Sequence, residues 1–380
     1  MLFDYETLKL IWWVLIGVLL IGFAITDGFD MGIGALIPLL GKTDEERRII
    51  INTVGPHWDG NQVWFITAGG ALFAAWPVVY GVAFSGFYWA MLLTLFALFF
   101  RPVGFEYRSK IENKLWRSFW DWGLFAGGFV PALVFGVAFG NLFLGVPFEL
   151  DPYMRSTYSG SFFALLNPFS LLSGALSVAM LMMHGAVYLQ LRSDGLVQQR
   201  ARFAAQLAAL VTLLCFSVAG FWLASKDVGY VISAMGNANE AMVPTSKTVM
   251  AHAGAWFNNY QLYSWMIAGP IMGLSGAALV FIFTRMARPG FAFLCSSVSV
   301  AGIICTAGWS LFPFVLPSSL NPSHSLTIWD VTSSAMTMNI MFWAAMIFVP
   351  LILCYTLWGY IKLWGKVTAK QIQDNPVGNY

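Results

Sequence analysis

Residues 9–40 read KLIWWVLIGVLLIGFAITDGFDMGIGALIPLL, an apolar stretch that carries two aspartates, Asp27 and Asp30. A membrane-spanning helix needs about 20 mostly apolar residues, so this stretch is long enough to cross a bilayer. The residues before it include Asp4 and Glu6, which have the wrong charge for the basic start of a cleavable signal peptide. We therefore interpret residues 9–40 as a retained first transmembrane helix.

The rest of the chain has a similar composition. Of its 380 residues, 58% are hydrophobic and 10% are charged, whereas about a quarter of the residues in a soluble domain are charged. The sequence therefore predicts an all-α integral membrane protein, with residues 1–380 forming a single polytopic domain. Its nine predicted transmembrane helices are 9–40, 54–79, 81–101, 119–143, 161–191, 202–224, 260–284, 291–313 and 336–362.

The orientation follows from the positive charges, because Lys and Arg are enriched in cytoplasmic loops. With the N-terminus outside and the C-terminus in the cytoplasm, 16 of the 20 Lys and Arg residues fall in cytoplasmic segments. An odd number of spans requires the same arrangement. Tryptophan and tyrosine are enriched at both membrane interfaces, and they fall near the predicted ends here, with Trp76 at an outer end and Trp358 and Tyr360 at an inner one.

Two acids lie within the first predicted span. An ionisable side chain inside a span costs roughly 2.5–3.5 kcal/mol on insertion scales, so each one indicates a function. Asp27 and Asp30 are three residues apart and share a helical face. Gly28, Gly32 and Gly34 allow another backbone to approach closely. The alternative is that the glycines only pack and the aspartates bond to neighbouring polar groups, which explains the glycines better than it explains two carboxylates.

The second predicted span begins within VGPHWDGNQVW, residues 54–64. We expect Asn52 or Thr53 to cap this helix, because both residue types favour the N-cap position. Pro56 suits its first turn.

Four polar side chains lie within six residues of this stretch: His57, Asp59, Asn61 and Gln62. His57 and Asn61 fall one above the other on a helix, and Asp59 and Gln62 share a neighbouring face. The alternative is an ordinary polar helix start at the headgroup level, where the helix dipole favours Asp59. That alternative explains a lone Asp59 better than it explains the whole group.

A third polar group is FFRPVGFEYRSK, residues 99–110, at the inner end of the third predicted span. Arg101, Glu106, Arg108 and Lys110 alternate in sign there, as they would in a cytoplasmic anchor with local ion pairs. On the predicted topology this group and the second one lie at the cytoplasmic interface, and the aspartates of the first span lie deeper. Carboxylates graded in this way make a proton-uptake path into the membrane a reasonable hypothesis.

The sequence offers no clear redox centre of its own. His57 and His184 are the only histidines in the predicted spans, and no two histidines share a span at ligand spacing. We interpret His184 as a packed or hydrogen-bonded residue. The four cysteines form no CxxC pair, and no zinc, phosphate-loop or nucleophile-elbow motif is present. We therefore expect no haem ligand and no metal site in this chain.

Several stretches together resemble subunit II of the cytochrome bd-type quinol oxidases. They occur in the order of that family, without large gaps, over essentially the whole chain. The stretches are DYETLKLIWWVLIGVLLIGFAITDGFDMGIG (4–34), GPHWDGNQVWFITAGGALFAAWP (55–77), FSGFYWAML (84–92), FFRPVGFEYRSK (99–110), GVAFGNLFLGVPF (136–148) and FPFVLPSS (312–319).

The resemblance implies a fold of two four-helix bundles plus a peripheral helix, in the bacterial cytoplasmic (inner) membrane. It implies assembly with a haem-bearing subunit I, which holds two b-type haems and one d-type haem, and often with a small single-helix subunit. The complex oxidises quinol and reduces O₂ to water, which builds a proton gradient without pumping. Subunit II would line a hydrophilic channel for cytoplasmic protons and in some members would hold a structural ubiquinone. No nucleic acid is expected as a partner.

The resemblance also assigns channel residues, with His57, Asn61 and Gln62 in support. Glu106 stands where family members carry the shorter aspartate, so its geometry differs by one methylene group. The channel residues are Asp59, Glu106, Lys110, Arg101, and Asp27 or Asp30 as the deeper carboxylate, with Asp27 the favoured one of the two.

Two other functions compete with this interpretation. A proton-coupled secondary transporter would show inverted repeats with paired Gly/Pro-broken helices, and we find no such matching pair. A self-sufficient cytochrome would need haem ligands of its own.

Overall fold

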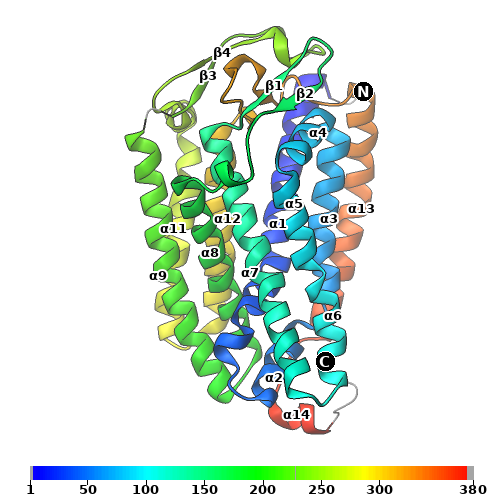
Figure 1. The fold of residues 1–380 in the computed structure, drawn as a ribbon, viewed down its shortest axis with the longest axis vertical. Helices are drawn as coiled ribbons and strands as arrows, with labels where there is room; N and C mark the ends of the chain where they lie inside the picture. Colours follow the sequence, from blue (N-terminus) through cyan, green and yellow to red (C-terminus); the bar gives the residue numbers. More distant parts are fainter. Residues whose placement is uncertain (1–2, 227, 375–380) are drawn as a thin grey trace.

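Long helices run side by side along the long axis of the molecule (Figure 1). The computed structural model describes residues 3–226 and 228–374. In this part of the chain eight helices are long and apolar enough to cross a membrane, and a bent pair of helices would make a ninth. Six of the eight are α1 (Tyr5–Leu40), α7 (Lys114–Leu144), α8 (Pro168–Arg192), α9 (Gly195–Ser225), α12 (Pro289–Leu311) and α13 (Ala335–Lys362).

The other two are assembled from shorter elements. One runs over Tyr88–Lys110 and consists of α5 (Tyr88–Leu98), α6 (Phe100–Tyr107) and a final 3₁₀ turn. The second runs over Ser264–Arg285 and consists of a 3₁₀ turn followed by α11 (Ala268–Arg285). A short helix, α10 (Asn258–Leu262), precedes it.

The bent pair is α3 (Trp58–Ala75) and α4 (Pro77–Gly86), whose axes differ by 119°. The residue before a proline disfavours the helical conformation, and Trp76 has φ −131° and ψ 65°. The break leaves backbone carbonyls at the end of α3 without partners in the helix, and the Ser333 backbone N–H donates to one of them, that of Ala75, at 2.9 Å. The predicted spans 54–79 and 81–101 are therefore wrong at their shared boundary. The other seven occur in the predicted order, with ends within seven residues of the predicted ones.

Helix α2 (Asp44–Val54) was not predicted. It begins with a capping box, in which the side chains of Thr43 and Glu46 bond to each other's backbone N–H groups. The prediction that Asn52 or Thr53 caps the next helix is wrong, because both lie inside α2. Their side chains donate to the carbonyls one turn back, of Arg48 at 2.8 Å and Ile50 at 2.6 Å. The N-cap of α3 is His57, whose side chain makes no capping bond; Pro56 lies in the intervening turn.

Helix α1 packs closely against α7 and α8 through glycines. A Cβ atom on Gly185 of α8 would lie 2.7 Å from the backbone nitrogen of Ile33, and one on Gly34 would lie 2.9 Å from the carbonyl oxygen of Leu124 in α7. A Cβ atom on Gly32 would collide with the backbone of Leu181. The prediction that these glycines of α1 allow another backbone to approach is therefore confirmed for Gly32 and Gly34.

Short β-hairpins gather at one end of the helices, which we call the hairpin end; α2 and α14 (Ala369–Asp374) lie at the opposite end, the α2 end (Figure 1). The three two-stranded antiparallel sheets are β1 (Phe148–Leu150) with β2 (Ser156–Tyr158), β3 (Tyr230–Ala234) with β4 (Thr248–Ala251), and β5 (Phe314–Leu316) with β6 (Leu326–Thr327). A buried ion pair joins Lys247 to Asp330 at 2.8 Å. Burial lowers the pKa of Lys247, and Asp330 opposes this shift.

Helix α13 lies at the edge of the molecule (Figure 1) and packs against α1. Met338 is the only one of its described residues that is fully buried. Near that residue, the Trp12 indole N–H donates to the Met338 carbonyl at 3.0 Å. The apolar surface of α13 thus remains largely exposed along the membrane-spanning stretch.

Candidate functional site

Two acids and one arginine meet inside the helix bundle. The Arg101 guanidinium of α6 donates to both carboxylate oxygens of Asp27, with Nη1 at 2.9 Å from Oδ2. Its Nη2 lies 4.0 Å from Oδ2 of Asp30. All three side chains are at most 2% exposed. Because one guanidinium faces two carboxyls and chelates Asp27, Asp30 is the acid without a full counter-charge.

Neighbouring helices make room for Arg101. A Cβ atom on Gly127 of α7 would lie 2.8 Å from the Cγ atom of Arg101, so this glycine accommodates the arginine side chain. The Trp58 ring of α3 lies 5.8 Å from the guanidinium carbon, within range of a cation–π interaction. The sequence places these residues far apart, and helix packing brings them together.

Asp30 has a second contact, through Asn61 of α3. The Asn61 amide Nδ2 donates to Oδ2 of Asp30 at 2.8 Å. The Tyr360 hydroxyl of α13 in turn donates to the Asn61 Oδ1 at 2.6 Å. Within the described residues, Oδ1 of Asp30 is buried and has no hydrogen-bond partner. We call Asp27, Asp30, Arg101, Asn61 and Tyr360 the intramembrane cluster.

His57 lies next to this cluster without bonding to it. Its Nδ1 is 2.9 Å from the Val54 carbonyl and its Nε2 is 2.8 Å from the Tyr188 hydroxyl. A carbonyl can only accept, so Nδ1 carries the proton, and in the neutral ring Nε2 accepts from Tyr188. The His57 and Tyr360 rings lie 4.9 Å apart. His57 and Asn61 lie one helical turn apart, as predicted, but their side chains bond to different partners.

The remaining predicted channel residues are on the surface of this chain. Asp59, Glu106 and Lys110 are exposed, and Gln62 is half-buried. Across residues 3–226 and 228–374, none of these side chains has a hydrogen bond or ion pair. The structure thus brings together Asp27, Asp30, Arg101 and Asn61 and leaves the others apart from them.

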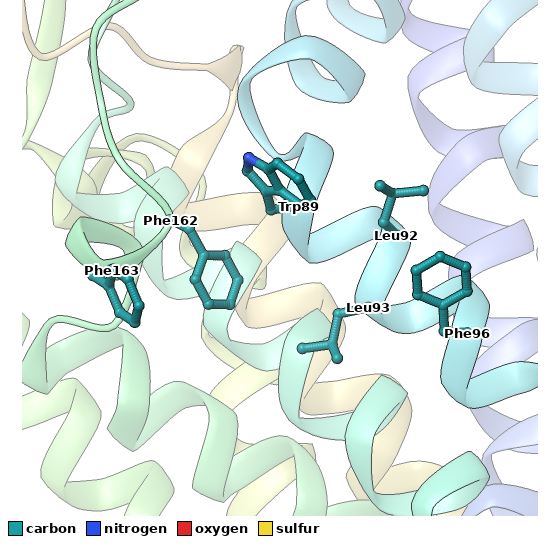
Figure 2. Close-up of a pocket in the computed structure, with 6 residues that line it drawn as sticks. All are labelled: Trp89, Leu92, Leu93, Phe96, Phe162 and Phe163. Carbon is teal, nitrogen blue, oxygen red and sulfur yellow. The ribbon is translucent and has the colours of Figure 1, made fainter.

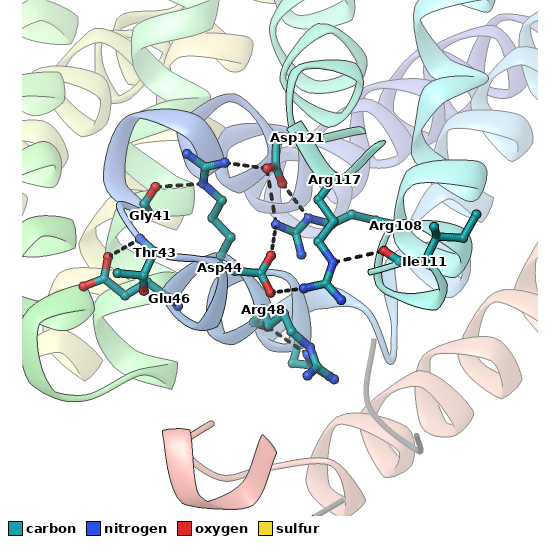
Figure 3. A network of polar contacts seen from close by, with 11 residues as sticks. Gly41, Thr43, Asp44, Glu46, Arg48, Arg108, Ile111, Arg117 and Asp121 are labelled. Atoms are coloured by element: carbon teal, nitrogen blue, oxygen red, sulfur yellow. Dashed lines mark hydrogen bonds and ion pairs between the residues drawn. The ribbon is translucent and has the colours of Figure 1, made fainter. Parts of the chain in front are cut away.

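A second charged group lies at the α2 end (Figure 3); the sequence analysis singled out its Arg108 but missed the acids with which that arginine pairs. Asp121 of α7 accepts from Arg108 Nε and from Arg47 Nη1, both at 2.6 Å. Asp44 accepts from Arg108 Nη2 at 2.9 Å and from Arg117 Nη1 at 2.6 Å. We call these five residues the α2-end network. Three arginines face two acids here, and all four carboxylate oxygens are paired.

Neither histidine within the helices offers a ring nitrogen to a haem iron. Both nitrogens of His57 are engaged, and His184 contacts the Ser296 hydroxyl through Nδ1 and the Ile25 carbonyl through Nε2, each at 2.8 Å. His184 therefore ties α8 to α12 and α1, in agreement with the structural role expected for it. A haem would have to displace these bonds to gain an axial ligand.

An apolar groove lies along α5 (Figure 2). It is lined by Trp89, Leu92, Leu93, Phe96, Phe162 and Phe163. This lining suits an acyl or isoprenyl chain. Among the six residues the Trp89 indole N–H is the one polar side-chain group, so the lining offers a single hydrogen-bond donor.

The fold and the intramembrane cluster define a class: a polytopic membrane protein that holds an excess of carboxyl groups between its helices. The family described as "Cytochrome bd terminal oxidase subunit II" matches residues 8–363. The chain belongs to the cytochrome bd terminal oxidase subunit II family.

Curated relatives support this membership. The chain is 55% identical to "Cytochrome bd-I ubiquinol oxidase subunit 2" of Escherichia coli (strain K12) over 98% of both chains. It is 54% identical to "Probable cytochrome oxidase subunit 2" of Haemophilus influenzae, again over 98% of both chains. It is 31% identical to "Cytochrome bd ubiquinol oxidase subunit 2" of Bacillus subtilis (strain 168), over 95% of this chain and 97% of that one.

A solved structure shares the fold. "The structure of bd oxidase from Geobacillus thermodenitrificans" contains a chain that matches with a TM-score of 0.69 at 18% identity. The match covers 95% of this chain and 100% of that one.

Proposed function

We propose that this chain is subunit II of a quinol:O₂ oxidoreductase complex in the bacterial cytoplasmic membrane and carries no redox centre itself. The family match over residues 8–363 carries the proposal. The hydrogen bonds that occupy His57 and His184 support the second part. In the complex, the haems of subunit I supply electron transfer and O₂ reduction. The residues of this chain support assembly and guide protons.

We further propose that the α2 end faces the cytoplasm. The arginine-rich α2-end network is at that end, as the positive-inside rule requires. The first described residues of α1 and the helix α14 lie at opposite ends of the molecule (Figure 1), which supports an outer N-terminus. Three further parts of this proposal rest on the family resemblance alone. They are the arrangement as two four-helix bundles with α13 as the peripheral helix, the small accessory subunit, and the structural ubiquinone.

Asp30 is our candidate for the deeper carboxylate that takes up and releases a proton. Asp27 is chelated by Arg101, so protonating it would break a buried ion pair, which is costly. Asp30 keeps a free oxygen, Oδ1, and has no guanidinium of its own. It can therefore gain a proton without disrupting another contact. Arg101 and Asp27 would act as its fixed electrostatic surroundings.

Asp59, Glu106 and Lys110 are proposed to line the cytoplasmic mouth of this path. Exposed ionisable side chains on a membrane-spanning surface are costly unless they face protein or water. Asp59 is in the first turn of α3 and Glu106 is in α6. We propose that subunit I covers this surface and supplies the other wall of the path.

Purification of the chain with and without subunit I tests the complex. We expect the pair to purify together and to give a reduced-minus-oxidised haem spectrum, and the chain alone to give no pyridine haemochromogen. Haem bound to the isolated chain would contradict the proposal. Solute movement by the isolated chain in liposomes would favour a proton-coupled transporter instead.

Asp59→Asn tests the mouth of the path. We expect normal haem content in the complex and quinol oxidase turnover lowered roughly tenfold, equivalent to about 1.4 kcal/mol in the barrier. Asp151→Asn, the same chemical change at the hairpin end, is the control and should leave turnover unchanged. Wild-type turnover in Asp59→Asn would exclude Asp59 as an obligatory relay, and loss of haem would make its role structural.

A further inference from the structure

We propose that Tyr360 is a positioning residue that sets the proton affinity of Asp30 through Asn61. The inference rests on the proposed role of Asp30. It adds a residue of α13, the least buried of the long helices, to the part of the molecule that controls proton uptake. Tyr360 does not touch Asp30, and its effect depends on the orientation of one amide group.

The hydrogen bonds have one consistent direction when Asp30 is ionised. A carboxylate only accepts, so the Asn61 amide must present its N–H to Asp30, which leaves Oδ1 for Tyr360. The Tyr360 hydroxyl then donates to that oxygen at 2.6 Å. In the described part of the chain, this hydroxyl makes no other hydrogen bond. The tyrosine therefore favours the orientation in which an N–H points at Asp30 at 2.8 Å.

The opposite orientation would favour protonated Asp30. If the amide flips, Asn61 presents its oxygen to Oδ2 of Asp30, and this contact repels an ionised carboxylate more strongly than a neutral carboxyl that carries its proton on Oδ1. The Tyr360 proton would lose its acceptor in that state. An N–H donor stabilises the ionised carboxyl and an oxygen acceptor stabilises the neutral one. By holding the amide in the first orientation, Tyr360 lowers the affinity of Asp30 for a proton.

Exchange of the proton takes place at the other oxygen. The amide of Asn61 does not relay protons readily, so the side of Asp30 facing Asn61 and Tyr360 is closed to transfer. Oδ1 of Asp30 has no partner and is the open side. The two oxygens thus have separate roles, one held by the amide and one free to bind the proton.

The other charged and titratable groups around Asp30 are held by contacts of their own. They are Asp27 on α1, Arg101 on α6, Tyr188 on α8 and His57 before α3. Asp27 and Arg101 pair with each other, and His57 bonds to Tyr188. The hydrogen bonds from Tyr360 to Asn61 and from Asn61 to Asp30 are the ones whose direction can reverse, because the Asn61 amide can flip. A change in α13 therefore reaches Asp30 through these two bonds.

The position of Tyr360 depends on how the end of α13 is attached. The Arg192 guanidinium of α8 donates to the Leu363 carbonyl at 2.7 Å, and the Val367 backbone N–H donates to the Arg192 carbonyl at 2.8 Å. The Arg192 guanidinium also lies 5.4 Å from the Trp364 ring. These contacts fix the segment next to Tyr360, while most of α13 has no buried side chain.

The test is Tyr360→Phe in the complex with subunit I, with quinol oxidase turnover measured against pH. We expect normal haem content. The alkaline limb of the turnover–pH profile should move to higher pH by about half a unit, because loss of one neutral hydrogen bond changes the proton affinity of Asp30 by roughly that amount. Tyr355→Phe, an exposed tyrosine of the same helix, is the matched control and should keep the wild-type profile. The Asp30 carboxyl stretch, identified in infrared difference spectra by its loss in Asp30→Asn, should shift in Tyr360→Phe.

A double-mutant comparison tests whether the effect passes through the amide. Asn61→Ala should move the same limb, and adding Tyr360→Phe to it should move the limb no further. An unshifted limb in Tyr360→Phe, or fully additive shifts in the double variant, would overturn the inference while leaving Asp30 as the proton carrier. Wild-type turnover in Asp30→Asn would instead overturn the proposed role of Asp30, so the two failures are distinguishable.

Discussion

The intramembrane cluster and the α2-end network both pair arginines with aspartates, but with opposite charge ratios. The cluster has two carboxyls for one guanidinium, and one acceptor oxygen of Asp30 has no partner among the described residues. The network has three guanidiniums for two carboxyls, and one donor of Arg108, Nη1, has no partner in the same part of the chain. The two groups meet along one segment, because Arg101 lies in α6 and Arg108 directly follows that helix.

This difference separates two kinds of charged group; in the α2-end network Arg108 and Asp121 are buried, whereas the Asp44 side chain is 41% exposed. Where every carboxylate oxygen is paired with a cation, protonating the acid breaks an ion pair, so the charges stay fixed and the group holds segments together. Where carboxyls outnumber the cations around them, one carboxyl can gain or lose a proton without breaking an ion pair. We therefore expect the ratio of acids to arginines, more than burial itself, to distinguish a structural network from the cluster proposed to exchange protons.

The largest effect should come from breaking the α2-end network. Asp121→Asn leaves Arg47, Arg108 and Arg117 facing one acid, and Arg108 is 1% exposed. We expect unfolding free energy to fall by about 3 kcal/mol, because a buried charge loses its partner. The temperature at which the detergent-solubilised complex loses its haem spectrum measures this loss. Turnover per assembled complex should remain at the wild-type value.

The surface pair Asp151–Arg155 is the control for this substitution. It is equally close, at 2.7 Å, but the Arg155 side chain is 76% exposed, and solvent-exposed pairs contribute little. Arg155→Gln, which removes this pair at its exposed partner, should leave the unfolding temperature unchanged. A network variant as stable as this control would show that the charges at the α2 end do not hold the fold.

Asp30→Asn should have the opposite effect to Asp121→Asn, with stability kept and turnover lowered. It removes the uncompensated acid and keeps its shape, so stability should hold or rise while turnover falls roughly tenfold, about 1.4 kcal/mol in the barrier. Asp27→Asn makes the same change three residues away and should instead lower stability, since Arg101 loses its chelating partner. Turnover at limiting and saturating quinol, with haem content for normalisation, checks both. Equal behaviour of the two variants would remove the distinction between Asp27 and Asp30.

Apolar length predicted most of the fold, because a membrane helix must satisfy its backbone internally and so has a minimum span. The failures are local. The boundary at Trp76 depends on the following proline, and α2 depends on a capping box between Thr43 and Glu46. Both signals are visible in the sequence, since Pro77 and the Thr-x-x-Glu spacing mark a helix start.

The intramembrane cluster could be predicted only in part. The spacing of Asp27 and Asp30 puts them on one face, but the contact between Asp27 and Arg101, 74 residues apart, depends on how helices pack. The charge pattern of residues 99–110 singled out Arg101 and the resemblance assigned it to the channel, but neither predicted its contact with Asp27. Tyr360 was expected in the interfacial belt, and only its contact with Asn61 shows that it points inward.

Two further discrepancies have different causes. Asp121 falls within the predicted span 119–143, so the rule that singles out ionisable residues in spans should have included it. What Asp59 and Glu106 face could not be predicted from this sequence, because the surface proposed to cover them belongs to another chain. Their assignment to a proton path stays a prediction.

The smallest expected effect concerns Glu46, which links α2 to α9. Partial burial acts to raise the pKa of its carboxyl, but hydrogen bonds from Arg200 and from the backbone N–H groups of Lys42 and Thr43 outweigh burial and lower the pKa below its ordinary value of 4.5. Because the pKa is lower in the folded state, the ionised carboxylate stabilises the fold above pH 4.5, and this contribution is lost as the pH falls from 4.5 through the folded-state value.

Glu46→Gln should therefore lower the unfolding temperature of the complex by a few degrees at pH 7, and the difference from wild type should shrink as the pH falls below 4.5. Thermal scans of both forms from pH 7 to the acid limit of the complex measure this convergence. Glu112→Gln, at an exposed position on the same side, removes the same charge and should show no difference at any pH. Glu46 would then behave as the paired acids of the α2-end network do, fixed in charge at neutral pH. A difference that grows towards acid would instead mean that protonation of Glu46 stabilises the folded protein, which would contradict its assignment as a paired acid.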